Sequence, residues 1–311
     1  MSKQRLLAQY DISGVWSAAP TPFTASMEID EASVRRMVQH HVRLGVKGLF
    51  LAGTNGEGPW LTNRQRRQLI RSVVRANRQR MPIAVQVTDN SAARVLDNIH
   101  EATEEGAMIA VVAQPYFFPD ATPAVLLAYY RTIIRRSPLP VGFYDRGRHS
   151  PVFVPKSILP AIYAEPNLVV IKDSSSDPVR MKIALAARQK RPALRLFDGD
   201  EFHAVPYLKA GYDGLLLGGG VFNGYLARQM IEAVASGEDD KAERLQRRMN
   251  RMMWAVYGGK KIECWLAGEK KLLVDMGIFR TWKNYPDYPL TPSCRKAIRR
   301  LLRTERQYLL P

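Results

Sequence analysis

The run LVVIK at residues 168–172 ends directly in the polar turn DSSSD at residues 173–177. A strand this rich in Val and Ile is typical of a parallel sheet that is buried on both faces. The carboxyl ends of such strands are where α/β enzymes place their reactive side chains. Burial at such a strand end favours the neutral, nucleophilic form of an amine, so Lys172 is a candidate for Schiff-base chemistry on a carbonyl. The alternative is a structural lysine that extends its charge from the strand end into water.

Eight short apolar runs of this kind alternate with longer segments of helical period, at residues 14–18, 48–52, 82–87, 108–112, 140–144, 168–172, 194–198 and 214–218. Alternating strands and helices require parallel strands joined by right-handed crossovers. Eight such units in one α/β domain favour a closed (β/α)8 TIM barrel over an open sheet. A helix after the second run is further indicated by the capping-box spacing of Thr62 and Gln65.

Residues 1–222 are therefore predicted to form the barrel, and residues 223–311 the last barrel helix and a C-terminal helical extension. The expected helices after the eighth run cover residues 225–236, 239–256, 264–276 and 293–306, separated by glycines and by the proline-containing stretch at 286–289. We expect this extension to pack on the barrel flank or against a neighbouring subunit, without chemistry of its own.

Composition narrows the classes of function. The net charge is +17, from 46 Lys and Arg against 29 Asp and Glu, but the arginines recur in helical segments, where solvated helix faces are the simplest explanation. Nucleic-acid binding is therefore not expected. The opening segment lacks the apolar core of a signal peptide, and no run approaches the ~18 apolar residues of a membrane span, which predicts a soluble cytoplasmic protein with no membrane partner. The two cysteines, Cys264 and Cys294, lack metal-ligand spacing, so a structural metal is not expected.

Two further strand ends carry candidate site residues. The second run leads into GTNGEG at residues 53–58, where backbone N–H groups can converge on a carboxylate; an ordinary tight turn explains the glycines equally well. The fifth run ends in Tyr144, whose phenol can move protons if a nearby cation lowers its pKa. A core tyrosine with a satisfied hydroxyl is the alternative. Since strands five and six are neighbours in a barrel, Tyr144 and Lys172 are expected to face one site.

Several ordered motifs at these strand ends carry a family resemblance. They are Thr21-Pro22-Phe23, GTNGE at 53–57, Pro115-Tyr116, Phe143-Tyr144, Ile171-Lys172-Asp173 and Gly199-Asp200. Over about residues 14 to 276 the chain resembles the dihydrodipicolinate synthase and N-acetylneuraminate lyase family of class I aldolases and lyases.

The resemblance implies that Lys172 forms an imine with the keto carbon of pyruvate or of a pyruvate-yielding 2-keto acid. It implies that Tyr144 moves protons, and that Thr54 and the backbone at Asn55 hold the substrate carboxylate. Substrate-binding positions are further implied for Gly53, Tyr116, Arg148 and Gly218. Members of the family are typically homotetramers, built as dimers of dimers, and need no metal or organic cofactor. An iminium is itself an electron sink, which agrees with that expectation.

Three positions depart from the pattern of dihydrodipicolinate synthases. Asn55 stands where a second Thr or Ser is usual, and Phe117 and Phe118 stand where a relay tyrosine follows Pro-Tyr. The familiar Tyr-Asn-x-Pro-x-Arg turn is replaced by YDRGRH at 144–149, so the arginine that meets an acidic second substrate is Arg148, Arg146 or neither. The sequence therefore favours a lyase, aldolase or dehydratase that acts on a 2-keto sugar acid or a related keto acid. Dihydrodipicolinate synthase itself and a barrel that binds a keto acid without turnover are the alternatives.

Overall fold

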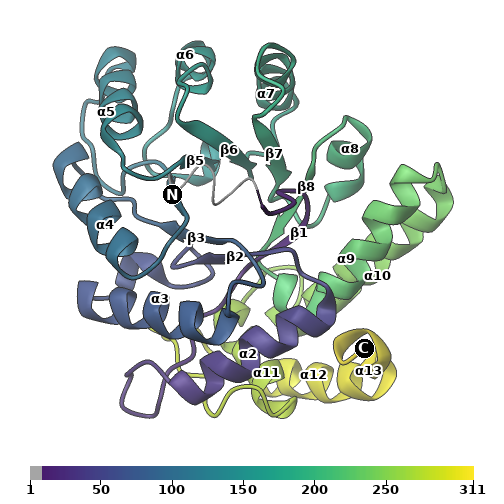
Figure 1. Ribbon diagram of the computed structural model, residues 1–311. Helices are drawn as coiled ribbons and strands as arrows, with labels where there is room; N and C mark the ends of the chain where they lie inside the picture. Colours follow the sequence, from purple (N-terminus) through teal and green to yellow (C-terminus); the bar gives the residue numbers. More distant parts are fainter. Residues whose placement is uncertain (1–8) are drawn as a thin grey trace.

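The computed structural model describes residues 9–311, which form a closed barrel of parallel strands in the order β1 to β8 (Figure 1). The strands are β1 Gly14–Ala18, β2 Gly48–Leu51, β3 Ile83–Gln86, β4 Ile109–Val112, β5 Val141–Asp145, β6 Leu168–Asp173, β7 Arg195–Asp198 and β8 Gly214–Leu217. The prediction of a TIM barrel is confirmed. Residues 1–8, on which part of the cytoplasmic expectation rests, lie outside the described residues.

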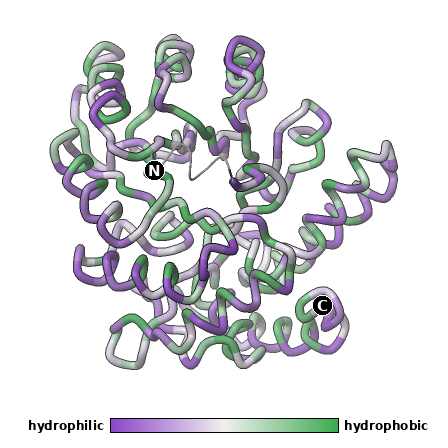
Figure 2. Tube along the Cα trace, in the orientation of Figure 1, coloured by the Kyte–Doolittle hydropathy of each residue, from purple (hydrophilic) through white to green (hydrophobic). Residues whose placement is uncertain are grey.

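Side chains on the two faces of the strands build two separate cores. The inward face fills the barrel with a small cluster that includes Trp16, Phe50, Tyr144 and Phe197. The outward face packs against the helices in one large apolar cluster. Alternate residues of a strand point to opposite faces, so a strand buried on both sides is apolar over most of its length, as the eight runs are. Figure 2 shows the same arrangement, with hydrophobic strands inside and hydrophilic outer helix faces.

In residues 9–311, one α-helix follows each strand on the outside of the barrel, and the helix after β8 leads into the C-terminal series (Figure 1). The barrel helices are α2 Glu31–Leu44, α3 Asn63–Asn77, α4 Ala92–Glu104, α5 Pro123–Arg136, α6 Leu159–Tyr163, α7 Pro178–Lys190, α8 Ala204–Lys209 and α9 Gly220–Ala235. The capping box predicted for α3 is present, since the Thr62 and Gln65 side chains each hydrogen-bond the other's backbone N–H. Short 3-10 turns lie at Gly58–Trp60, Gly147–His149 and Lys156–Ile158.

The C-terminal extension consists of α10 Asp239–Tyr257, α11 Trp265–Asp275, α12 Pro292–Thr304 and α13 Arg306–Leu309. Helix α10 packs along α9, and α11 and α12 pack on α10 (Figure 1). The extension also reaches back to the loops that follow β1 and β2. There Thr281 Oγ1 donates to the Phe23 carbonyl at 2.8 Å, and Tyr285 N donates to Glu57 Oε2 at 2.6 Å. It therefore covers part of the end of the barrel where the candidate site lies.

Among residues 9–311, no helix is long and apolar enough to cross a membrane. Most arginines of α3 lie on its solvated side, whereas Arg66 is buried, and several pair with carboxylates. Arg71 contacts Glu105 at 2.7 Å, and Arg64 contacts Glu28 at 2.9 Å. These pairs agree with the interpretation of the basic helix faces as solvated surface.

Candidate active site

A cavity of about 320 Å³ opens at the carboxyl ends of the strands. The barrel contributes Ala18, Thr54, Asn55, Tyr144, Arg146, His149, Lys172, Ser174, Ser176, Gly199, Asp200, Glu201, Phe202 and Gly218 to its wall, and the extension contributes Tyr257, Ile262 and Trp265. The expectation that the extension only flanks the barrel was therefore incomplete, because three of its residues line the cavity. This is the end of a (β/α)8 barrel at which enzymes carry out their chemistry.

Lys172 is part of this wall and is 6% exposed. Its Nζ lies 4.3 Å from the centroid of the Tyr144 ring and 5.2 Å from that of the Phe50 ring. Strand register places it beside Tyr144, since the two residues are direct partners in the β5–β6 pair. Gly199 makes room for the lysine, because a Cβ atom there would lie 2.7 Å from Lys172 Cε. The amine is thus held between aromatic faces at the cavity surface.

The environment of Tyr144 suits proton transfer. Burial by itself raises the pKa of its phenol. The Lys172 ammonium, the Arg146 guanidinium and the nearby hydroxyls of Thr54 and Ser174 together lower the pKa below its usual value. A phenol with a lowered pKa gives up and regains a proton more readily near neutral pH.

The turn after β2 contributes Thr54 and Asn55 to the cavity wall. Within residues 9–311, the N–H groups of Thr54, Asn55 and Gly56 donate to no protein acceptor. The Asn55 side chain, in contrast, is engaged: its Nδ2 donates to the carbonyls of Ala18 and Gly218 at 2.9 and 3.1 Å. A third acceptor, Glu269 Oε1 from α11, lies 3.2 Å away. This amide therefore orients the turn, while the N–H groups remain available to an anion.

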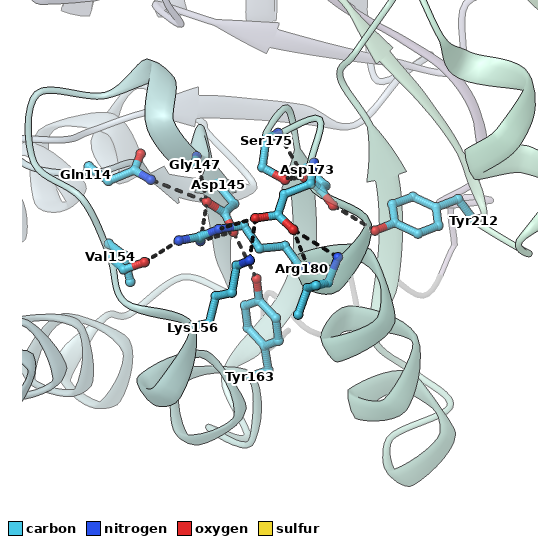
Figure 3. A network of polar contacts seen from close by, with 12 residues as sticks. Gln114, Asp145, Gly147, Val154, Lys156, Tyr163, Asp173, Ser175, Arg180 and Tyr212 are labelled. Carbon is cyan, nitrogen blue, oxygen red and sulfur yellow. Dashed lines mark hydrogen bonds and ion pairs between the residues drawn. The ribbon is translucent and has the colours of Figure 1, made fainter.

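A buried network of polar groups supports the strand ends from behind (Figure 3). Asp145, the residue after Tyr144, accepts from Arg180 Nη1 at 2.7 and 2.9 Å, and both side chains are 1% exposed. Arg180, on α7, also donates to the Val154 carbonyl. The same Asp145 accepts from Gly147 N at 2.9 Å, which fixes the turn that carries Arg146. Charge-assisted hydrogen bonds of this kind hold a backbone in one geometry.

Asp173, the residue after Lys172, is fixed in a similar way (Figure 3). It accepts from Ser175 N at 2.9 Å, from Ser175 Oγ at 2.6 Å and from the Tyr212 hydroxyl at 2.9 Å. Burial raises the pKa of Asp173 in spite of these hydrogen bonds. Asp145 follows Tyr144 and Asp173 follows Lys172, so hydrogen bonds to these two aspartates fix both strand ends that carry the candidate catalytic side chains.

The outer wall of the cavity combines a cation with hydrogen-bonding groups. Arg146 lines it, and exposed Arg148 does not. Glu201 Oε2 accepts from Gly219 N at 2.7 Å, and Oε1 accepts from the Tyr257 hydroxyl at 3.0 Å. Sequence reasoning missed Glu201, although its place two residues after Gly199 on the β7 turn was a usable signal. It also missed Tyr257, for which no local pattern exists.

Of the residues predicted for the site, Lys172, Tyr144, Thr54, Asn55 and Gly218 line one cavity. The predicted substrate contacts Gly53, Tyr116 and Arg148 lie outside its wall.

Two of these three positions have a structural explanation. Gly53 allows close packing, because a Cβ there would lie 2.6 Å from the Phe50 ring. The Tyr116 hydroxyl accepts from Gln86 Nε2 at 2.8 Å, and burial raises the pKa of this phenol to about 12. The two phenylalanines at the position of the relay tyrosine differ in their surroundings. Phe117 is 69% exposed, whereas the centroid of the Phe118 ring lies 6.0 Å from that of the Tyr129 ring.

The fold and the site together define a class of protein. It is a (β/α)8-barrel chain with an amine and a phenol at the carboxyl ends of adjacent strands and a free backbone turn beside them. The chain belongs to the dihydrodipicolinate synthetase family, whose sequence profile matches residues 11–304. This is a family of pyruvate-dependent class I aldolases and lyases.

Individual relatives agree with this assignment. The chain is 28% identical over 294 residues to 4-hydroxy-tetrahydrodipicolinate synthase of Acidobacterium capsulatum, covering 94% of this chain and 95% of the relative. It is 32% identical over 235 residues to the enzyme of the same name from Stenotrophomonas maltophilia strain R551-3, covering 75% and 77%. The structure of the chloride-inhibited dihydrodipicolinate synthase from Acinetobacter baumannii complexed with pyruvate superposes with a TM-score of 0.81 at 22% identity, covering 94% and 98%. At 22% identity, the similarity to this last structure shows a shared fold and no more.

Proposed function

We propose that the protein is a Schiff-base lyase that acts on pyruvate or a 2-keto sugar acid, with the imine on Lys172 and Tyr144 as proton shuttle. The observation that carries the proposal is the position of Lys172 Nζ, 4.3 Å from the Tyr144 ring, in the wall of a cavity at the carboxyl end of the barrel. A homotetrameric assembly, as is typical of the family, belongs to the same proposal.

The first steps follow from the groups around this amine. The substrate carboxylate binds the N–H groups of the turn at Thr54 and Asn55, which places the neighbouring keto carbon near Lys172. The neutral amine attacks that carbon, the oxygen leaves as water after two proton transfers, and an iminium remains. Tyr144 supplies and removes protons in these steps. The iminium then accepts the electron pair of a C–H or C–C bond at the next carbon as an enamine forms.

The outer wall favours a substrate that carries both hydroxyl groups and a negative charge. Arg146 supplies a cation. Glu201, Tyr257 and His149 add groups that hydrogen-bond hydroxyls. A 2-keto sugar acid, or a shorter keto acid with a hydroxyl and a second carboxylate, fits this combination. Dihydrodipicolinate synthase is the second candidate, and the relatives from Acidobacterium capsulatum and Stenotrophomonas maltophilia, both 4-hydroxy-tetrahydrodipicolinate synthases, favour it.

Trapping with pyruvate and borohydride tests the proposal. Reduction of the imine leaves a stable adduct that intact-mass measurement detects and peptide mapping assigns to Lys172. Lys172→Ala is expected to abolish the adduct, and Lys182→Ala, at an exposed position on α7, is the matched control. Absence of an adduct from the unaltered protein would favour a keto-acid-binding barrel. Robust condensation of pyruvate with aspartate semialdehyde would instead favour dihydrodipicolinate synthase.

A further inference from the structure

Helix α11 of the C-terminal extension contacts the turn after β2 through two consecutive residues. Glu269 Oε1 lies 3.2 Å from Asn55 Nδ2, and Lys270 Nζ contacts Glu57 Oε1. All four side chains are buried. Neither residue of α11 lines the cavity that holds the reactive amine. The extension thus holds, from outside the cavity, the turn whose free N–H groups form the proposed carboxylate site.

Three structural elements meet at the amide nitrogen of Asn55. Its Nδ2 donates to the carbonyls of Ala18, at the end of β1, and of Gly218, directly after β8, at 2.9 and 3.1 Å. These two acceptors already match the two protons of a primary amide. The Glu269 carboxyl is therefore a third acceptor, which the hydrogen-bonding needs of Asn55 do not require. Acceptors from β1, β8 and α11 together restrict the amide to one position.

The carboxyl of Glu269 is costly to the fold. Within residues 9–311, its Oε2 is buried without a hydrogen-bond partner, and such an atom destabilises the folded state. Burial raises the pKa of this carboxyl, and the charges of Glu201 and Glu57 raise it further. Asn55 and Lys270 lower it without offsetting burial. Since an apolar side chain of similar size is often more stable at such a position, stability does not explain why α11 carries a carboxyl there.

We propose that Glu269 is a positioning residue: by holding the Asn55 amide, it fixes the turn that binds the substrate carboxylate and so sets the affinity for the 2-keto acid. This inference rests on the proposed function, because the bound carboxylate is that of the keto acid. Backbone N–H groups bind an anion more tightly when their directions are fixed beforehand, since ordering them on binding costs free energy. The cost of the buried carboxyl to stability is thus exchanged for affinity at the site.

Exchange of the methyl protons of pyruvate with D2O measures this effect with pyruvate as the only substrate. As the enamine forms, a methyl proton leaves, and a deuteron from the solvent later replaces it, so proton NMR follows the loss of the methyl signal. Glu269→Met removes the acceptor at nearly constant length. It is expected to raise KM for exchange about 10-fold, near the upper end of what one hydrogen bond contributes. The value of kcat is expected to change by less than about 2-fold, because contacts to the carboxylate stabilise the bound substrate and the transition state alike.

Stability and a conservative variant separate positioning from a structural role. Glu269→Met is expected to unfold at a urea concentration no lower than that of the unaltered chain, because it removes a buried oxygen without a partner. Glu269→Gln keeps an acceptor oxygen for Asn55 and is expected to have a KM within about 2-fold of the unaltered value. Glu243→Met, at an exposed position on α10, is the matched control and is expected to leave KM unchanged.

A double-mutant cycle shows whether Glu269 acts through Asn55. Asn55→Ala is expected to raise KM by itself, and adding Glu269→Met is expected to raise it no further, because the amide that the carboxyl holds is gone. An unchanged KM or a lower unfolding midpoint in Glu269→Met, an equal rise of KM in Glu269→Gln, or independent effects in the cycle would each overturn the inference. Absence of both exchange and a borohydride-trapped adduct in the unaltered protein would instead overturn the proposed function, and the inference with it.

Discussion

Two lysines are buried near the mouth of the barrel, and they are held in opposite ways. Lys172, at the end of β6, is bounded by the rings of Tyr144 and Phe50, and no ion pair to it occurs within residues 9–311. Lys270, on α11, is fully buried and contacts Glu57 of the turn after β2, and its Nζ also donates to the Lys283 carbonyl at 2.8 Å. Burial lowers the pKa of Lys270 even so.

The contrast separates a reactive lysine from a structural one. A buried charge is tolerated when a carboxylate and further hydrogen bonds replace its hydration, as they do for Lys270. An amine in a cavity wall without a carboxylate partner is instead free to approach a carbonyl carbon, as Schiff-base chemistry requires. The paired lysine joins the extension to the barrel, and the unpaired one faces the cavity.

The largest effect is expected at the unpaired lysine. Lys172→Met removes the amine but keeps a side chain of similar length between the aromatic rings. We expect turnover to fall by more than about 10⁴-fold, because the electron sink is lost, with little change in the free energy of unfolding. Steady-state assays with 2-keto sugar acids measure turnover, and urea unfolding measures the free energy of unfolding. Strong destabilisation would show that Lys172 is also structural and would break the comparison.

The paired lysine is expected to show the reverse pattern. Lys270→Met leaves the Glu57 carboxylate buried without its cation, and loss of one partner of a buried pair costs about 3–5 kcal/mol of unfolding free energy. Adding Glu57→Gln removes the uncompensated charge, so the double variant is expected to recover most of that loss. Urea unfolding of the three variants measures the coupling. If Lys270→Met were as stable as the unaltered chain, Lys270 and Glu57 would both be uncharged in the native state.

How far the sequence predicts this architecture depends on how local each signal is. The strand ends at Lys172 and Tyr144 follow from apolar runs of a few residues and from the neighbour rule of barrels. The Lys270–Glu57 contact joins residues 213 positions apart, and the Tyr257–Glu201 bond joins residues 56 apart, so no window along the chain reveals either.

The positions of the predicted substrate contacts that lie outside the cavity wall have a related physical cause. Tyr116 follows a strand as the resemblance requires, but the direction of its side chain depends on Gln86 of a neighbouring strand. The choice between Arg146 and Arg148 depends on the 3-10 turn at Gly147–His149, which Asp145 fixes through Gly147 N. A short turn without periodicity leaves no pattern from which to predict which arginine faces the cavity.

The Asp145–Arg180 pair sharpens the comparison, since it is a buried ion pair directly behind a candidate catalytic residue. Asp145→Asn keeps an acceptor but removes the charge, so Arg180 stays buried with weaker hydrogen bonds. We expect the free energy of unfolding to fall by about 2 kcal/mol, the usual worth of a hydrogen bond to a charged group. Urea unfolding measures this, with Asp97→Asn at an exposed position of α4 as the control. Equal losses in the two variants would show that the charge at Asp145 is not needed.

The smallest effect is expected from two buried histidines on α2 that remain neutral. His40 Nε2 contacts the Val221 carbonyl at 2.8 Å, and His41 Nε2 contacts Ser17 Oγ at 2.9 Å. Burial lowers the pKa of His40 to about 4 and that of His41 to about 3.

Because the folded pKa values lie below the unfolded value of about 6.5, the unfolded chain binds more protons below neutrality, and stability falls as the pH is lowered. Between pH 7 and pH 6 each histidine is expected to cost roughly 0.7 kcal/mol. Buried carboxyls with raised pKa values, such as Glu269, contribute with the opposite sign, so the total slope alone does not identify the histidines. His40→Gln removes one titrating group. Between pH 7 and pH 6 we therefore expect the unfolding free energy of this variant to fall by roughly 0.7 kcal/mol less than that of the unaltered chain. Urea unfolding at the two pH values measures the difference, and an unchanged slope would show that His40 is already protonated when folded or is hydrated.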